Sequence, residues 1–190
     1  MSWDYPQLLD EIAGQIRTCT RCRLCEGRTQ AVPGVGPPDA EIMFVGEAPG
    51  QDEDLQGEPF VGPAGRVLTD LLKSNGIARE DVYITNICKC RPPQNRDPHP
   101  DEVEACREFL DGQIACIRPT LICTLGAPAL KTVLDDATLS VMKLNGTTVE
   151  RHGLTFVPLI HPAAGLHQER MREGIKEGFR RLGEIIAERR

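Results

Sequence analysis

The sequence lacks any hydrophobic run that approaches the length of a membrane span. Residues 1–6 also lack the basic segment and the apolar stretch that mark a secretory signal. No internal repeat, low-complexity tract or linker is evident along the 190 residues. These absences predict a cytoplasmic protein with no membrane partner, folded as one domain over residues 1–190. We expect a monomer, because no extra interface element is evident.

Hydrophobic residues make up 40% of the chain, an ordinary share that allows a real core and excludes a disordered chain. Cysteine is abundant instead, with eight residues. In the reducing compartment expected for this chain, disulfides are disfavoured. Metal binding or catalysis is then the more natural use of the thiols.

The net charge of −6 argues mildly against a nucleic-acid partner, but the basic residues are unevenly distributed. One basic group surrounds the first cysteines with Glu26 as the only acid, and a second surrounds the next cysteine pair with none. Local potential, rather than total charge, steers a phosphate backbone. Charge alone leaves open whether these are anion-facing loops or merely solvated ones. The two groups are Arg17, Arg21, Arg23 and Arg28, and Lys89, Arg91 and Arg96.

Four short apolar runs are continuous rather than alternating, which is typical of buried parallel strands. Helical patterns alternate with these runs, so the sequence predicts an α/β fold. The expected architecture is a three-layer α/β/α sandwich around a four-stranded parallel sheet. Pro158 predicts an edge position or a bulge in the last strand. The strands are expected at 42–45, 82–85, 121–125 and 156–160, and the helices at 6–17, 63–75, 100–117, 127–135 and 168–188.

In open parallel sheets, ligands bind beyond the carboxyl ends of the strands. The residues at those ends are the loop 46–50, Asn86, Gly126 and the pair His161-Pro162. We therefore expect a Gly/Pro-rich loop, an amide and an imidazole to converge on one pocket.

Cys19 and Cys22 form a Cys-x-x-Cys pair in a loop before the first strand. Thioredoxin-type redox pairs follow a strand and open a helix, so a metal or cluster site is favoured here. Cys88 and Cys90 follow a strand in a basic loop, where a buried structural role is less natural.

The remaining cysteines have simpler explanations. Cys123 lies within an apolar strand, and Cys106 and Cys116 lie on the expected helix 100–117, where core packing is the default. Spacing alone does not choose between Cys88 and Cys90, and it does not exclude Cys25. It also fails to separate zinc from an iron–sulfur cluster, because both accept four thiolates.

Several motifs follow one another in a fixed order along the chain. They are Gly46-Glu47-Ala48-Pro49-Gly50, then Glu53, Pro59-Phe60-Val61-Gly62, the run from Asn86 to Arg96, and His161-Pro162-Ala163. Together they closely resemble the family 4 uracil-DNA glycosylases, bacterial and archaeal enzymes that carry a four-iron four-sulfur cluster. The resemblance runs from about Cys19 to the C-terminus.

This resemblance implies a DNA repair enzyme of base excision repair. Such an enzyme flips uracil out of single- or double-stranded DNA and hydrolyses its N-glycosidic bond, which leaves an abasic site. Flipping costs roughly a few kcal/mol, because the base leaves its stack. The pocket must then stabilise the negative charge that develops on the leaving uracil.

The family's ligand pattern falls on Cys19, Cys22, Cys90 and Cys106. The resemblance therefore implies a four-iron four-sulfur cluster with a structural role, held by loops at 19–38 and 88–106. It leaves four extra thiols, which are Cys25, Cys88, Cys116 and Cys123.

The resemblance also implies a catalytic set of three residues. His161 would donate a hydrogen bond to uracil O2 as charge develops there, which follows oxyanion-hole logic. Glu47 belongs to the pocket loop, and Glu53 would position water or block the thymine methyl group. Family 1 uracil-DNA glycosylases carry an aspartate where Ala48 stands, so this chain lacks that water-activating carboxylate. Catalysis would then rest on leaving-group stabilisation more than on a strong base.

By the same resemblance, Phe60 stacks on the flipped uracil and Asn86 reads its edge, because an amide can both donate and accept. The backbone of Gly46, Ala48 and Gly50 would complete the binding pocket. DNA itself would be contacted by two further residues. These are Arg91 and Leu166, the latter as an apolar wedge inserted into the base stack.

Each key residue also has an ordinary structural explanation. Phe60 suits a core aromatic after a turn, Asn86 a strand-end turn, and His161 a satisfied histidine before a proline.

Two other functions stay open. One is a relative that captures uracil-DNA covalently through a histidine in an inserted basic loop, although no such insertion lies between Arg91 and Pro100. The other is a non-catalytic iron–sulfur module that binds nucleic acid, against which the intact pocket motifs argue. The sequence does not indicate whether a sliding clamp recruits the chain.

Overall fold

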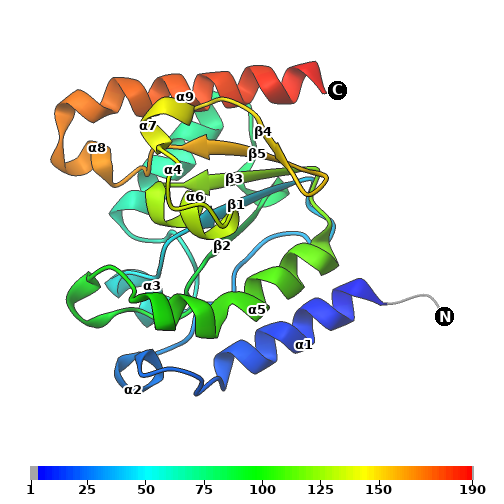
Figure 1. Ribbon diagram of the computed structural model, residues 1–190, viewed down its shortest axis with the longest axis vertical. Coiled ribbons are helices and arrows are strands. Elements are labelled where there is room, and N and C mark those ends of the chain that lie inside the picture. Colours follow the sequence, from blue (N-terminus) through cyan, green and yellow to red (C-terminus); the bar gives the residue numbers. More distant parts are fainter. Residues whose placement is uncertain (1–3, 190) are drawn as a thin grey trace.

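The computed structural model describes residues 4–189, which form a five-stranded mixed sheet in the order β2-β1-β3-β5-β4 (Figure 1). Four strands are parallel, whereas β4 pairs antiparallel with β5. The strands are β1 (Ile42–Gly46), β2 (Tyr83–Asn86), β3 (Leu121–Leu125), β4 (Val149–Arg151) and β5 (Leu154–Leu159). The α/β fold and the four parallel strands are confirmed, but a fifth strand makes the sheet mixed.

The apolar pattern could not predict β4, because this strand has only three residues and none of them is buried. A tight turn joins it to β5 through His152 and Gly153, both with left-handed φ values of 52° and 76°. β4 pairs with β5 only as far as Phe156. Pro158 lies beyond this pairing, where its carbonyl accepts the Gly146 N–H at 2.8 Å. A proline is tolerated there because that edge of β5 has no ladder.

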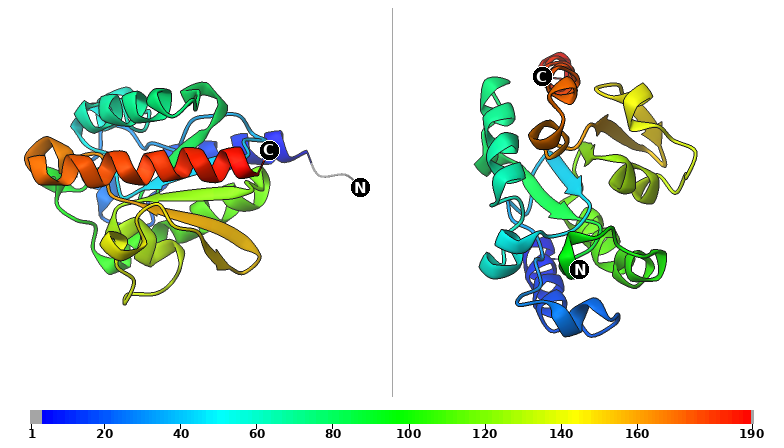
Figure 2. Two further views of the ribbon diagram at one scale, coloured as in Figure 1. Left: turned by 90° about the horizontal axis from the view of Figure 1, so that it is seen from above. Right: turned by 90° about the vertical axis from the view of Figure 1, so that its left-hand side faces the viewer.

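Helices cover both faces of the sheet (Figure 2). α4 and α9 pack on one face, and α1, α5 and α6 pack on the other. Within the described residues, no helix is both long and apolar enough to cross a membrane. The helices are α1 (Tyr5–Arg17), α2 (Leu24–Gly27), α3 (Gln51–Gln56), α4 (Pro63–Ser74), α5 (Pro100–Ile117), α6 (Ala127–Val133), α7 (Val141–Leu144), α8 (Ala164–His167) and α9 (Glu169–Glu188), with 3-10 turns at Arg79–Asp81 and Pro93–Asn95.

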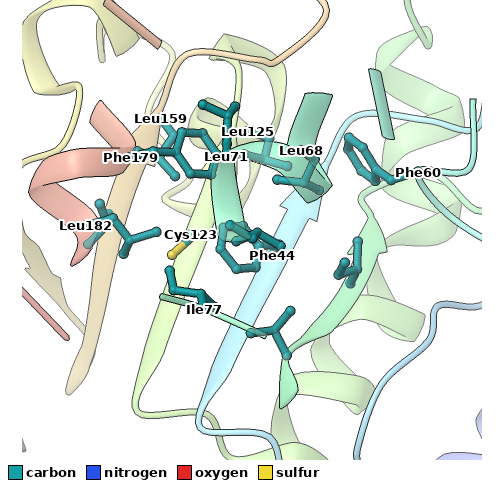
Figure 3. Close-up of a cluster of buried hydrophobic side chains, with 14 of the residues drawn as sticks. Phe44, Phe60, Leu68, Leu71, Ile77, Cys123, Leu125, Leu159, Phe179 and Leu182 are labelled. Carbon is teal, nitrogen blue, oxygen red and sulfur yellow. The ribbon is translucent and has the colours of Figure 1, made fainter. Parts of the chain in front are cut away.

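Alternate residues of each central strand enter opposite core layers. In β1, Phe44 faces the layer of α4 and α9, whereas Met43 and Val45 face the other layer. Phe44 stacks on Phe179 of α9 with ring centroids 6.4 Å apart (Figure 3). Both faces of the sheet are therefore buried, which explains the continuous apolar runs of the parallel strands.

Replacing the fully buried Phe179 by alanine should lower the free energy of unfolding by about 3–5 kcal/mol, because it removes apolar contacts and leaves a cavity. Urea denaturation followed by circular dichroism measures the change. Met142→Ala is the control, because Met142 is 59% exposed and its loss should change stability by no more than about 0.5 kcal/mol. Equal effects of the two substitutions would contradict the core assignment.

Candidate functional site

A cleft of about 540 Å³ lies beyond the carboxyl ends of β1, β2 and β5. It joins nearly all the pocket residues that the sequence predicts. Those lining the cleft are Glu47, Ala48, Gly50, Glu53, Phe60, Asn86, His161 and Leu166. Gly46 lies directly against this set, whereas Arg91 does not line the cleft. Gly126 packs against His161, where an added Cβ would stand 3.2 Å from the histidine Cβ.

Glu53 ties two loops of the cleft together. One carboxylate oxygen accepts the Gly50 N–H at 3.1 Å, and the other accepts the Val61 and Gly62 N–H groups at 3.0 and 2.8 Å. Glu53 is the third residue of α3, so it also caps that helix. In this structure, both oxygens are engaged with the backbone, and the carboxylate positions the loop that carries Phe60.

Phe60 has a left-handed φ of 54°, an unusual conformation for a bulky residue. Its ring lies 5.7 Å from that of His161, centroid to centroid, at an interplanar angle of 30°. The Arg79 guanidinium stabilises this bend, because it donates to the carbonyls of Pro59 and Phe60 at 3.1 and 2.8 Å. Gly65 is required as well, since a Cβ there would lie 1.8 Å from the Phe60 carbonyl oxygen.

Asn86 ends β2 and is buried, with 2% exposure. Its side-chain Oδ1 has no hydrogen-bond partner among the described residues. A Cβ on the adjacent Gly46 would stand 2.4 Å from this oxygen and 2.7 Å from the Phe60 ring. Glycine at position 46 therefore lets the amide and the aromatic ring share the cleft. An unpaired buried acceptor is costly, so Oδ1 suits a ligand that donates a hydrogen bond.

His161 is held in one tautomer. Its Nδ1 accepts the Ala163 N–H at 3.0 Å, so the proton of a neutral ring lies on Nε2. Burial lowers the pKa of His161 to about 4, which keeps the ring neutral at physiological pH. The imidazole can thus serve as a neutral donor beside Phe60.

Glu47 lines the same cleft next to Asp97, a residue that the sequence motifs did not single out. Burial, together with the charge and hydrogen bonding of Asp97, raises the pKa of Glu47 to about 7. Two carboxyl groups in contact cannot both ionise freely, so the pair retains a proton near neutral pH.

The four predicted ligand cysteines meet at a second place. Cys90 and Cys106 belong to a buried apolar cluster with Ile16, Leu24 and Phe109, and the partly buried Cys19 and Cys22 pack against it. They line a small hollow between the two cysteine loops. Cys25 also lines the hollow, but Cys88 does not. The structure therefore brings the two cysteine loops together.

Three N–H donors point at sulfurs of these cysteines. The backbone N–H of Arg21 donates to Cys19 Sγ at 3.4 Å, and the guanidinium of Arg28 donates to Cys90 Sγ at 3.1 Å. The backbone N–H of Lys89 donates to Cys106 Sγ at 3.3 Å. Burial raises the pKa of the Cys22 and Cys106 thiols, and that of Cys90 to about 11. Free thiols here would stay protonated, and only a bound metal would favour thiolates.

Three of the four extra thiols, Cys88, Cys116 and Cys123, are buried. Cys116 and Cys123 lie in the two core layers on either face of the sheet. Burial raises the pKa of Cys88 and Cys123, which makes both poor nucleophiles. Within residues 4–189, no three His, Cys, Asp or Glu side chains gather closely enough to hold a single metal ion.

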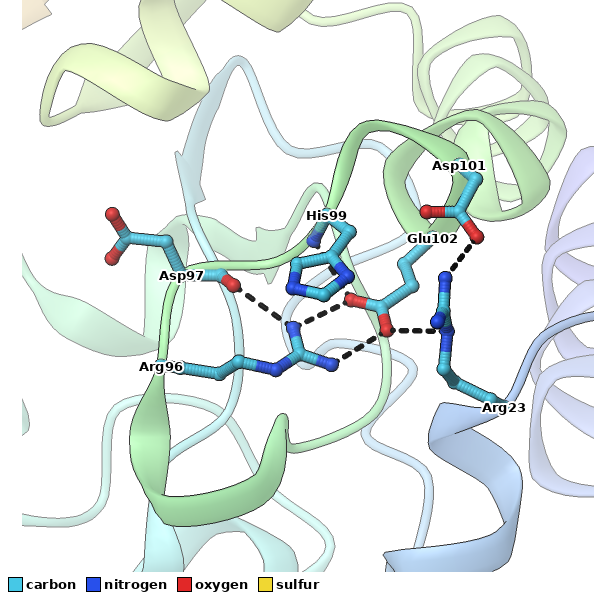
Figure 4. Close-up of polar contacts among 6 residues, drawn as sticks. All are labelled: Arg23, Arg96, Asp97, His99, Asp101 and Glu102. Carbon is cyan, nitrogen blue, oxygen red and sulfur yellow. Dashed lines mark hydrogen bonds and ion pairs between the residues drawn. The ribbon is translucent and has the colours of Figure 1, made fainter.

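A buried carboxylate links the cysteine loops to the cleft (Figure 4). Glu102 of α5 accepts two hydrogen bonds from the Arg96 guanidinium, at 2.7 and 2.8 Å, and the His99 N–H at 2.8 Å. It also pairs with Arg23 at 3.2 Å, and Arg23 contacts Asp101. The Arg96 hydrogen bonds lower the pKa of Glu102 to about 2. Because Arg96 lines the cleft, the Glu102 carboxylate connects the cysteine loop that carries Arg23 to the cleft.

The two predicted DNA contacts lie at the border of the site. Leu166 of α8 lines the cleft and is 42% exposed, which suits an apolar residue at the rim. Arg91 is partly exposed and donates to the Asn95 side chain at 2.7 Å. Asn95 itself lines the cleft, so Arg91 reaches the site through this neighbour.

Comparison with known proteins places this geometry in a family. The uracil DNA glycosylase superfamily model matches residues 33–182. A type-4 uracil-DNA glycosylase from Archaeoglobus fulgidus is 47% identical over 188 residues, which cover 95% of this chain and 94% of the relative. One from Saccharolobus solfataricus is 43% identical, covering 94% and 87%. A type-5 enzyme from Thermus thermophilus is 30% identical, covering 63% and 70%. The chain therefore belongs to the uracil-DNA glycosylase superfamily and, within it, to the type-4 uracil-DNA glycosylases.

Proposed function

We propose that this chain removes uracil from single- and double-stranded DNA by hydrolysing the N-glycosidic bond, which leaves an abasic site for base excision repair. The observation that carries the proposal is the unpartnered, buried Asn86 Oδ1 in a cleft shared with Phe60 and a neutral His161. Uracil N3–H is a donor that matches this acceptor, and the Asn86 amide NH2 matches uracil O4. Cytosine presents the opposite pattern at both atoms, so the same amide rejects it.

Phe60 binds the flipped base, whereas His161 and Glu47 act on the bond that breaks. Phe60 offers its ring as a stacking platform for the flipped base. As the bond between C1′ and N1 breaks, its electron pair passes to uracil, and the His161 Nε2–H donates to O2 where negative charge accumulates. Water adds to C1′, and Glu47 orients that water and takes up its proton. Ala48 carries no carboxylate, so leaving-group stabilisation bears most of the catalysis.

We also propose that the cysteine hollow holds a four-iron four-sulfur cluster on Cys19, Cys22, Cys90 and Cys106. The arrangement of the four thiols and the three N–H donors to sulfur support a cluster. When bound, the cluster supplies a covalent tie between the loops at 19–38 and 88–106. Arg23 and Arg96 both pair with Glu102, and these ion pairs connect the cluster loops to the cleft.

DNA binding involves the rim of the cleft in this proposal. Arg91 contacts a phosphate, and Leu166 fills the gap left by the flipped base. We further propose that residues 1–190 act as one domain and as a monomer. The relatives described above come from archaea and bacteria, whose DNA lies in the cytoplasm, and this supports work in that compartment.

Incubation with a single-stranded uracil oligonucleotide, followed by alkali, should cut the strand at the uracil. His161→Ala should lower kcat by about 10²–10³-fold, because the leaving uracil loses one donor. His152→Asn is the control, since His152 lies in the exposed β4–β5 turn and asparagine tolerates its left-handed φ. A folded wild-type protein that binds the oligonucleotide without forming an abasic site, or that forms a stable adduct with it, would contradict the proposal.

The rate should depend on pH through Glu47. Its raised pKa of about 7 predicts that kcat increases as pH rises through neutrality, because the ionised carboxylate orients water. Asp97→Asn removes the neighbouring charge, so the pKa of Glu47 falls and the rising limb moves to lower pH. Single-turnover rates between pH 5 and 9 measure both profiles. An unchanged limb in Glu47→Gln would exclude Glu47 as its source.

Cys106→Ser should abolish the iron, the acid-labile sulfide and the visible absorption of the purified protein, because one of four ligands is lost. Cys116→Ser is the matched control from the same helix, since Cys116 lies in the core layer beneath α5. It should retain all three signals. Equal iron content in the two variants would contradict the proposed ligand set.

A further inference from the structure

Lys89 is a fully buried ammonium with three neutral acceptors. The residue is 1% exposed. Its Nζ donates to Thr85 Oγ1 at 2.6 Å, to the Asn86 carbonyl at 2.7 Å and to Gln113 Oε1 at 2.7 Å. An ammonium has three donors, so its hydrogen bonding is complete. The charge itself, however, remains without a compensating negative group among these partners.

No aspartate or glutamate within residues 4–189 forms an ion pair with Lys89. Taking an isolated charge out of water is expensive, and proteins almost always pair such a charge. The buried acid Glu102 does not serve, because it already pairs with Arg23 and Arg96. Burial accordingly lowers the pKa of Lys89 to about 8, and a negative group nearby would stabilise its ammonium form.

The cysteine hollow lies next to Lys89 and would become negative once a cluster binds. Lys89 itself lines that hollow, its backbone N–H donates to Cys106 Sγ at 3.3 Å, and Cys90 follows it in the chain. Four thiolates around an iron–sulfur core carry a net negative charge. In a poorly hydrated interior, a fixed positive charge at this position interacts strongly with that group.

We propose that Lys89 is the counter-charge of the cysteine-bound cluster and raises its reduction potential. The inference rests on the cluster proposed above. Reduction adds one electron and one more negative charge to the cluster, and the ammonium stabilises that product more than the oxidised form. Arg28 also donates to a cluster cysteine, but it is half-buried, so water screens its charge.

The experiment compares three variants with the wild-type holoprotein. Lys89→Met keeps an unbranched stem and removes the charge, Lys89→Arg keeps the charge, and Lys131→Met removes an exposed lysine of α6 as the matched control. Iron and sulfide are measured first. The cluster is then titrated with dithionite under argon in the presence of mediators, and its visible absorption gives the midpoint potential.

Lys89→Met should shift the midpoint to more negative potential, whereas Lys89→Arg and Lys131→Met should stay close to wild type. If Lys89→Met fails to bind iron but Lys89→Arg binds it, the charge requirement is supported at the stage of assembly. A fully loaded Lys89→Met with an unshifted midpoint would overturn the inference, and so would failure of both Lys89 variants to load. A wild-type protein without iron and sulfide would instead overturn the cluster proposal, and this inference with it.

Discussion

The parallel pairing of β1 with β2 sets Gly46 directly beside Asn86, and the rest of the site depends on this register. Because position 46 has no side chain, the Asn86 amide and the Phe60 ring occupy the space above it. A shift of one residue would bring the side chain of Val45 or Glu47 against Asn86 and would turn the amide to the other face of the sheet. The same pairing places the β2–α5 connection, with Lys89 and Cys90, directly behind the cleft.

The loops around the cleft are fixed by charged side chains that bind backbone or one another. Glu53 holds the β1 loop to the Phe60 loop, Arg79 holds the Phe60 bend, and Glu102 holds Arg96. Each is a charge-assisted contact in partly or fully buried surroundings, which is stronger than a neutral hydrogen bond. Such ties keep long irregular segments in one conformation without the regular ladders of helices or strands. A glycosylase needs this rigidity, because its donors must already be aimed when the base arrives.

The sequence predicted the features that depend on short-range apolar patterns and on where the strands end. Continuous apolar runs located β1, β2, β3 and β5, and their ends located Asn86 and His161. The sequence did not predict β4, because its half-exposed residues form no apolar run. The sequence also did not predict the roles of Arg79, Asp97 and Glu102. These roles depend on partners in other segments, which are Phe60 for Arg79, Glu47 for Asp97 and Arg23 for Glu102. The choice of Cys90 over Cys88 likewise needed the family pattern, because neighbouring thiols differ only in which one faces the hollow.

The electrostatics of the two buried regions differ in a way that suits their tasks. At the cleft, burial keeps His161 neutral, so the pocket does not present a strong positive charge to the uracil. A neutral donor costs little to bury and gains strength only as the base becomes an anion, which favours the transition state over the bound substrate. Near the cysteines, by contrast, Lys89 is buried among three neutral acceptors and forms no ion pair with a carboxylate of the described residues. The cleft therefore meets transient charge with neutral donors, whereas the proposed cluster would supply the lasting negative charge that Lys89 lacks.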